Sequence, residues 1–362
     1  MKYFLCALLI LFCLTPAVSA RDELSGIVDI RSLERNVPDE AEQTVRGLSP
    51  DGAGSLEEGI GNLWGQVGAL FGGALSDSLK TAGMLLAIAL LTGMAGGVTD
   101  GRAAGYVTLA GVMGVAVLSV TGLGSFIASA KDSLGRLADY SKLLLPSLAA
   151  AGAAAGQPAS SVARQAVTAL FWDGLITLYD RLLFPLMYVY AALLTLQSAF
   201  AQDGVKRLAG LIKWLVGGVL GLSLTVFTLY LTISGAISGQ ADALAMKSAR
   251  VTLSGMVPVV GGIIGDASET LVAGAGILKN SIGLFGLFVV LGVTAGPCVG
   301  LGVRYIAFKL TAALSGSVCD ERLAGYMDGL SSLFAMVLGM TAASGFLLCV
   351  SIISCVQAGG GM

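Results

Sequence analysis

Long uncharged apolar stretches dominate the chain, and the charged residues between them are few. Six of these stretches can cross a bilayer, which takes about 20 predominantly apolar residues in a helix. They cover residues 81–99, 103–130, 182–202, 214–241, 280–303 and 329–362. We therefore expect an all-α polytopic membrane protein with six to eight transmembrane helices.

Two further apolar segments are interrupted by proline and small residues. Residues 143–163 contain Pro146 and a run of alanines, and residues 251–265 contain Pro258 and several glycines. Non-helical backbone at membrane depth is tolerated only where protein buries it or where it lines a water-filled cavity. Each segment is therefore either a re-entrant hairpin or broken helix beside a pathway, or a short small-residue helix that packs closely on its neighbours.

The two broken segments occupy matching places in a pattern that occurs twice. Each follows two spans and a short charged stretch, so the multi-span region 80–362 divides into units of about 81–170 and 182–278, with two further spans after them. Interrupted segments at matching positions of two halves mark the central site of transporter-like folds. The pattern thus favours an internal duplication.

The region before the first span has three parts. Residues 1–20 have one lysine, an apolar core and small residues before Arg21, the pattern of a signal peptide cleaved after Ala20; an uncleaved anchor is the alternative. Residues 21–58 hold ten acidic and four basic residues and predict a flexible, acidic, extracytoplasmic tail. Residues 59–79 have apolar positions at helical spacing and predict an amphipathic helix, either at the membrane interface or packed on the protein's own spans.

Composition narrows the classes of function. Charged residues make up 12% of the chain, against about 25% in soluble domains. The formal net charge of −2 provides no basic surface for nucleic acid. The chain has no histidine, the commonest general base and metal ligand, and it has no nucleotide-binding, hydrolase or metal motif. We expect a protein that is not an enzyme and that has no cofactor.

Charged and helix-breaking residues gather around the second broken segment. Ionisable residues within a membrane mark pathways, whereas charges at the interface simply end helices, and the sequence leaves both interpretations open. The candidate pathway or packing residues are Asp242, Lys247, Pro258, Gly261, Gly262, Asp266, Glu269, Lys279, Asn280 and, in the first broken segment, Pro146.

One stretch of the chain resembles a known family, the stage III sporulation protein AE family of endospore-forming bacteria. The stretch is GQADALAMKSARVTLSGMVPVVGGIIGDASETLVAGAGILKNSIGLFG, residues 239–286. The matching features are Asp242, Lys247, the PVVGG run from Pro258, the acidic and serine run Asp266–Glu269, and Lys279–Asn280 followed by Gly283 and Gly286. The first broken segment also fits, although it is richer in alanine than the family pattern.

The resemblance implies a non-enzymatic, multi-pass subunit of a channel or secretion-like complex between mother cell and forespore. Such a subunit would lie in the outer forespore membrane, on the mother-cell side, and would support forespore maintenance and late forespore gene expression. Its partners would be the lipid bilayer, the other membrane proteins of the stage III A operon, including an ATPase and ring-forming subunits, and indirectly stage II sporulation protein Q, but not nucleic acid. The residues alone leave two alternatives, a stand-alone secondary transporter for a small solute and a membrane scaffold without a pathway.

Overall fold

The fold consists of helices and the turns between them. The computed structural model describes residues 30–52, 55–99, 102–200, 203–256, 261–317 and 319–357, without the side chains of 231–274 and of a few single positions. The helices are α3 (Ile30–Arg35), the 3-10 turn η1 (Asp39–Ala41), α4 (Leu56–Val98), α5 (Arg102–Ala154), α6 (Pro158–Leu178), the π-helical turn η2 (Tyr179–Leu183), α7 (Phe184–Phe200), α8 (Asp203–Met256), α9 (Gly261–Ser315) and α10 (Glu321–Gln357).

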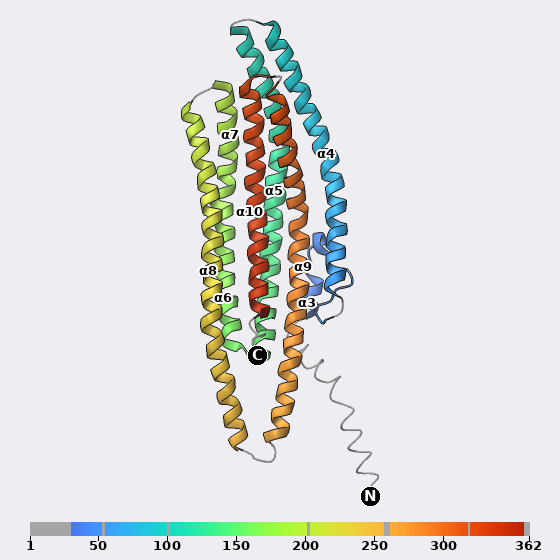
Figure 1. The fold of residues 1–362 in the computed structure, drawn as a ribbon, viewed down its shortest axis with the longest axis vertical. Helices are drawn as coiled ribbons and strands as arrows, with labels where there is room; N and C mark the ends of the chain where they lie inside the picture. The colour runs from blue at the N-terminus through green and yellow to red at the C-terminus, as the bar shows by residue number, and fades with distance from the viewer. Residues whose placement is uncertain are drawn as a thin grey trace.

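The long helices form one elongated antiparallel bundle (Figure 1). α10 lies in its middle and packs against α9, α5, α7 and α8, whereas α8 and α4 lie on the outside. The described residues include six helices that are long and apolar enough to cross a membrane: Leu56–Val98, Ala103–Ala154, Ser161–Phe200, Gly204–Tyr230, Ala275–Ser315 and Glu321–Val356. Each overlaps one of the six predicted stretches, and no strand occurs in the described part, which confirms the all-α membrane fold.

Local sequence signals set several helix ends. At the start of α4, the Ser55 hydroxyl accepts a hydrogen bond from the Glu58 amide at 3.2 Å, and the Glu58 carboxylate accepts one from the Ser55 amide at 3.0 Å. This reciprocal pair satisfies two backbone donors that the first turn leaves free. At the start of α10, the Asp320 carboxylate caps the helix by accepting one hydrogen bond, from the Arg322 amide at 2.9 Å.

The first broken segment, residues 143–163, is interrupted in the structure, but not at its first proline. Pro146 does not interrupt the chain but lies inside α5, which continues to Ala154. The chain turns instead at Gly156, whose positive φ of 82° favours glycine, and α6 then begins at Pro158, where a missing amide hydrogen costs nothing. Buried Leu144, Leu145 and Leu148 hold the helix around the proline against its neighbours. In the second segment, α8 ends at Met256 and α9 begins at Gly261, and the residues between them, Pro258 included, lie outside the described residues.

The N-terminal segment, residues 30–52, is not the flexible tail that its charge predicts. Leu33, Ala41, Thr44, Val45 and Leu48 are all buried, and the segment packs on α5 and α9. Its few apolar residues follow no helical or strand period, which is why the sequence pattern does not reveal the packing. The helix expected over 59–79 is continuous with the first span in α4.

Gly292 of α9 allows the N-terminal segment to approach closely. A Cβ atom there would lie 2.9 Å from Ala41 Cα and 2.7 Å from Thr44 Oγ1. Gly292→Ala is therefore expected to weaken the docking of the segment by about 1–3 kcal/mol, as overpacking does, and to speed proteolysis within residues 30–52. Gly296→Ala is the matched control on the same helix, because a Cβ there meets nothing within 4 Å. Equal cleavage rates in the two variants would contradict the prediction.

Candidate functional site

The structure describes the predicted motif only in part. The positions whose side chains lie outside the described residues are Asp242 and Lys247 on α8 and Gly261, Gly262, Asp266 and Glu269 on α9. Pro258 and the cleavage pair Ala20 and Arg21 lie outside the described residues altogether. Lys279, Asn280 and Pro146 remain, and the structure places all three.

Lys279 is buried where the two predicted segments meet. Its side chain, on α9, is only 2% exposed, and Nζ donates a hydrogen bond to Gln157 Oε1 at 3.0 Å. Gln157 lies in the turn between α5 and α6, inside the first broken segment. Lys279 therefore contacts the end of the segment that contains Pro146, while Pro146 and Asn280 themselves are exposed.

Arg164 is a second buried cation at this end of the bundle, and it was not among the predicted residues. It is 5% exposed on α6, and its guanidinium donates to the Ser354 carbonyl oxygen of α10, while its Nε has no partner in the described part of the chain. One turn further along α6, the hydroxyl oxygens of Thr168 and Ser351 lie 2.9 Å apart. The only sequence signal was a single arginine next to the alanine-rich run. These polar contacts fix α6 against α10.

Four helices share a level of the bundle at which they carry no charged residue. We call these stretches the uncharged slab: residues 59–76 of α4, 214–241 of α8, 280–303 of α9 and 329–357 of α10. The shortest is about 27 Å long at about 1.5 Å per residue, close to the hydrocarbon core of about 30 Å.

Contacts between the helices set them at the same level. Gln66 Nε2 of α4 donates to the Gly292 carbonyl oxygen of α9 at 3.3 Å. Gly345 of α10 packs closely on Thr294 of α9, where a Cβ would lie 2.6 Å from Thr294 Cγ2. α8 is joined to this level through Phe227, whose ring stacks on Phe171 of α6 with centroids 4.5 Å apart.

α5 is different, because it carries charges at the level of the slab. Above the charges, the Phe126 ring meets Phe334 of α10 with centroids 6.1 Å apart. Below them, Leu144 packs against Gly286 of α9. The charged residues between these two contacts are Lys131, Asp132, Arg136, Asp139 and Lys142. The neighbouring stretch of α9 has no charge at all.

The charges border a groove of about 460 Å³, which we call the charged groove. Its polar lining comes from Lys131, Asp132, Arg136 and Asp139 of α5 and from Tyr179 and Asp180 of η2. Two ion pairs lie in this lining, Lys131 with Asp180 at 3.2 Å and Arg136 with Asp132 at 2.8 Å. A third joins the lining residue Asp139 to Lys142, next to the groove, at 2.8 Å. Their side chains are between 38% and 78% exposed. The groove is therefore open and strongly polar.

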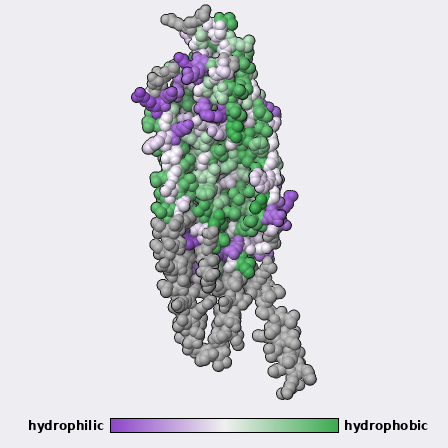
Figure 2. Space-filling view, viewed as in Figure 1, coloured by the Kyte–Doolittle hydropathy of each residue, from purple (hydrophilic) through white to green (hydrophobic). Residues whose placement is uncertain are grey.

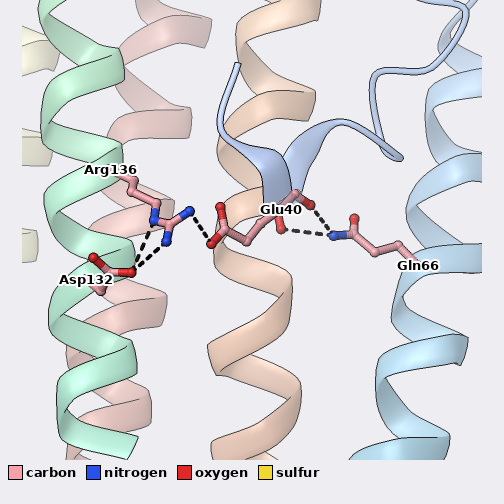
Figure 3. A network of polar contacts seen from close by, with 5 residues as sticks. Glu40, Gln66, Asp132 and Arg136 are labelled. Atoms are coloured by element: carbon pink, nitrogen blue, oxygen red, sulfur yellow. Dashed lines mark hydrogen bonds and ion pairs between the residues drawn. The ribbon is translucent and has the colours of Figure 1, made fainter. Parts of the chain in front are cut away.

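The N-terminal segment reaches one edge of the groove. The Glu40 carboxylate lies 2.7 Å from the Arg136 guanidinium, and the Glu40 backbone carbonyl accepts from Gln66 Nε2 at 2.5 Å. The Thr44 hydroxyl donates to the Gln66 Oε1 atom. Figure 3 shows Glu40 between Arg136 on α5 and Gln66 on α4, so the segment links these two helices across α9. It thereby holds Arg136 in place at the edge of the charged groove.

Six helices that are long and apolar enough to cross a membrane, packed in one bundle, are the features of a polytopic membrane protein, and the charged groove lies on its surface. A family model described as stage III sporulation protein AE matches residues 45–359, and the chain belongs to that family.

A curated relative, the stage III sporulation protein AE of Bacillus subtilis (strain 168), is 25% identical over 201 residues, which are 55% of this chain and 50% of the relative. The matched stretch thus spans about half the length of that relative. No solved structure matches the chain.

Proposed function

We propose that this protein is a non-enzymatic membrane subunit of a channel or secretion-like complex between mother cell and forespore. Its family gives the role in sporulation. The observation that carries the step to a channel is the charged groove at the level of the uncharged slab. Membrane proteins place ionisable side chains at that depth mainly along ion or substrate pathways. A scaffold without a pathway would have no use for them.

The proposal places the protein in the outer forespore membrane, with the other membrane proteins of the stage III A operon as partners. A partner ATPase supplies the energy, because the sequence has no nucleotide-binding motif of its own. Ring-forming subunits and, indirectly, stage II sporulation protein Q continue the complex toward the forespore. The motif from Asp242 to Asn280 stays a candidate for packing or for lining a pathway, and buried Lys279 lies at its described end.

Deletion of the gene in the native organism tests this function. After engulfment, we expect shrunken forespores and a silent late forespore reporter, because the forespore would no longer be maintained. A wild-type copy expressed only in the mother cell should restore both. Normal forespores with an active reporter would overturn the proposed function. The solute-transporter alternative would then lead, and uptake by vesicles that contain the purified protein would test it.

A further inference from the structure

The hydrocarbon core is best placed at the uncharged slab. Four of the six long spans are free of charge there. This placement corrects the expectation for two stretches: residues 81–98 of α4 and 103–121 of α5 lie beyond the slab, where Gly122 approaches Arg304 and Thr108 bonds to Asp320. Nearer the turn between α9 and α10, three of the same helices carry charges: Lys213 on α8 donates to Ser332 at 3.2 Å, and Lys309 on α9 pairs with Asp328 on α10. Figure 2 shows hydrophilic side chains in the upper part of one face, mainly apolar surface below them, and hydrophilic side chains again at the lower right and lower edge of the coloured surface.

At this depth the charged groove cannot face lipid. Its ion-paired side chains remain well exposed in the isolated chain, and hydrocarbon offers neither water nor hydrogen bonds to them. Charged side chains at membrane depth face the interior of a bundle or a water-filled cavity. The groove therefore needs either water or another polypeptide against it.

Water fits the groove better than a tightly packed protein surface. Each cation in the three pairs already has a carboxylate of this chain within 3.2 Å, so no counter-charge from a partner is required. A dry partner surface would remove water from all three pairs, and the desolvation of ion pairs often exceeds their attraction. Asp180 also lies in η2, and π-helical turns occur frequently at functional sites.

We propose that the charged groove is one wall of a water-filled path through the membrane, closed on its outer side by a neighbouring polypeptide of the assembly. The inference rests on the proposed channel function, because the polypeptide that closes the path would belong to the proposed complex. Three cations of the wall face four carboxylates, because Glu40 adds to the three paired aspartates, so the wall has a small excess of negative charge. The path therefore suits small hydrophilic solutes that are neutral or positively charged. The N-terminal segment forms one edge of this wall, where Glu40 pairs with Arg136.

Cysteine labelling in membranes tests the path. The groove positions are Ala128→Cys and Gly135→Cys, and the controls at the same depth are Leu222→Cys and Val226→Cys, whose native side chains are 65% and 48% exposed on α8. All four are placed in a chain whose own cysteines are replaced by alanine, within the assembled complex. A charged, membrane-impermeant thiol reagent is expected to label the groove positions at least about tenfold faster, because it attacks the thiolate, which hydrocarbon disfavours.

Two results would overturn the proposal. Equal rates at groove and control positions would mean that the groove is no wetter than the lipid face. Groove cysteines that resist the reagent but form disulfides between two copies would mean that the groove is a dry contact. The labelling reports contact with water rather than sporulation, so it can fail while the deletion phenotype holds. Conversely, the deletion strain could form normal spores while the groove cysteines react fast. That result would overturn the role in sporulation and would still support the water-filled path.

Discussion

Leu222→Lys is expected to reduce the amount of correctly inserted protein sharply, whereas Ala128→Lys should leave it close to that of the wild type. The Leu222 side chain lies on α8 within the uncharged slab and is 65% exposed, so a lysine there would enter lipid. A charge at the centre of a membrane helix costs about 2.5–3.5 kcal/mol on insertion scales. That cost is a large fraction of the stability of a typical domain.

Ala128 is the matched position because it is also exposed at the level of the uncharged slab but borders the charged groove. A lysine there is one helical turn before Asp132, where an opposite charge is favourable rather than costly. Quantitative blotting of membrane fractions and protease protection measure insertion in both variants, with Leu222→Met as the control for a change of side chain alone. Equal losses for the two lysines would show that the groove faces lipid like α8.

Phe334→Ala is expected to destabilise the bundle strongly. The Phe334 ring is 2% exposed and meets two other rings, Phe126 edge-on at 6.1 Å and Phe308 at 5.0 Å. Loss of a buried phenylalanine costs about 3–5 kcal/mol through lost contacts and the cavity left behind. Arg304 also lies over the Phe126 ring, with Cζ 3.6 Å from its centroid, so the cluster joins α5, α9 and α10 above the charged groove.

Thermal unfolding of the purified protein in detergent measures this effect. Phe346→Ala is the control, since Phe346 is on the same helix but is 58% exposed. We expect a large fall in the unfolding temperature for Phe334→Ala and little change for Phe346→Ala. If both variants unfold at the wild-type temperature, the three rings do not hold the helices together as the structure indicates.

The spans were predictable because a helix that crosses lipid must be apolar for about 20 residues, and that requirement is visible in the sequence itself. Pro146 was misleading, because neighbouring helices can hold a helix together around a proline. Leu33, Val45 and Leu48 were missed as core residues since their spacing has no period. In each case the packing of neighbours, and not the local pattern, decided the outcome.

The candidate site was only partly predictable. The charges of α5, such as Lys131 and Arg136, were plain in the sequence as a short charged stretch between spans. Their depth was not, because it depends on how far α5 is shifted along the bundle relative to α9 and α10. The contacts of Phe126 with Phe334 and of Leu144 with Gly286 define that shift. Sequence periodicity contains no information on such a shift.

Helices α8 and α9 are much longer than a membrane crossing requires. α9 has 55 residues and α8 has 54, so each is about 80 Å long at about 1.5 Å per residue. A hydrocarbon core of about 30 Å accounts for less than half of that length. The remainder, more than half of each helix, extends outside the lipid. Most of the length of these two helices is therefore available for contacts in water rather than with the bilayer.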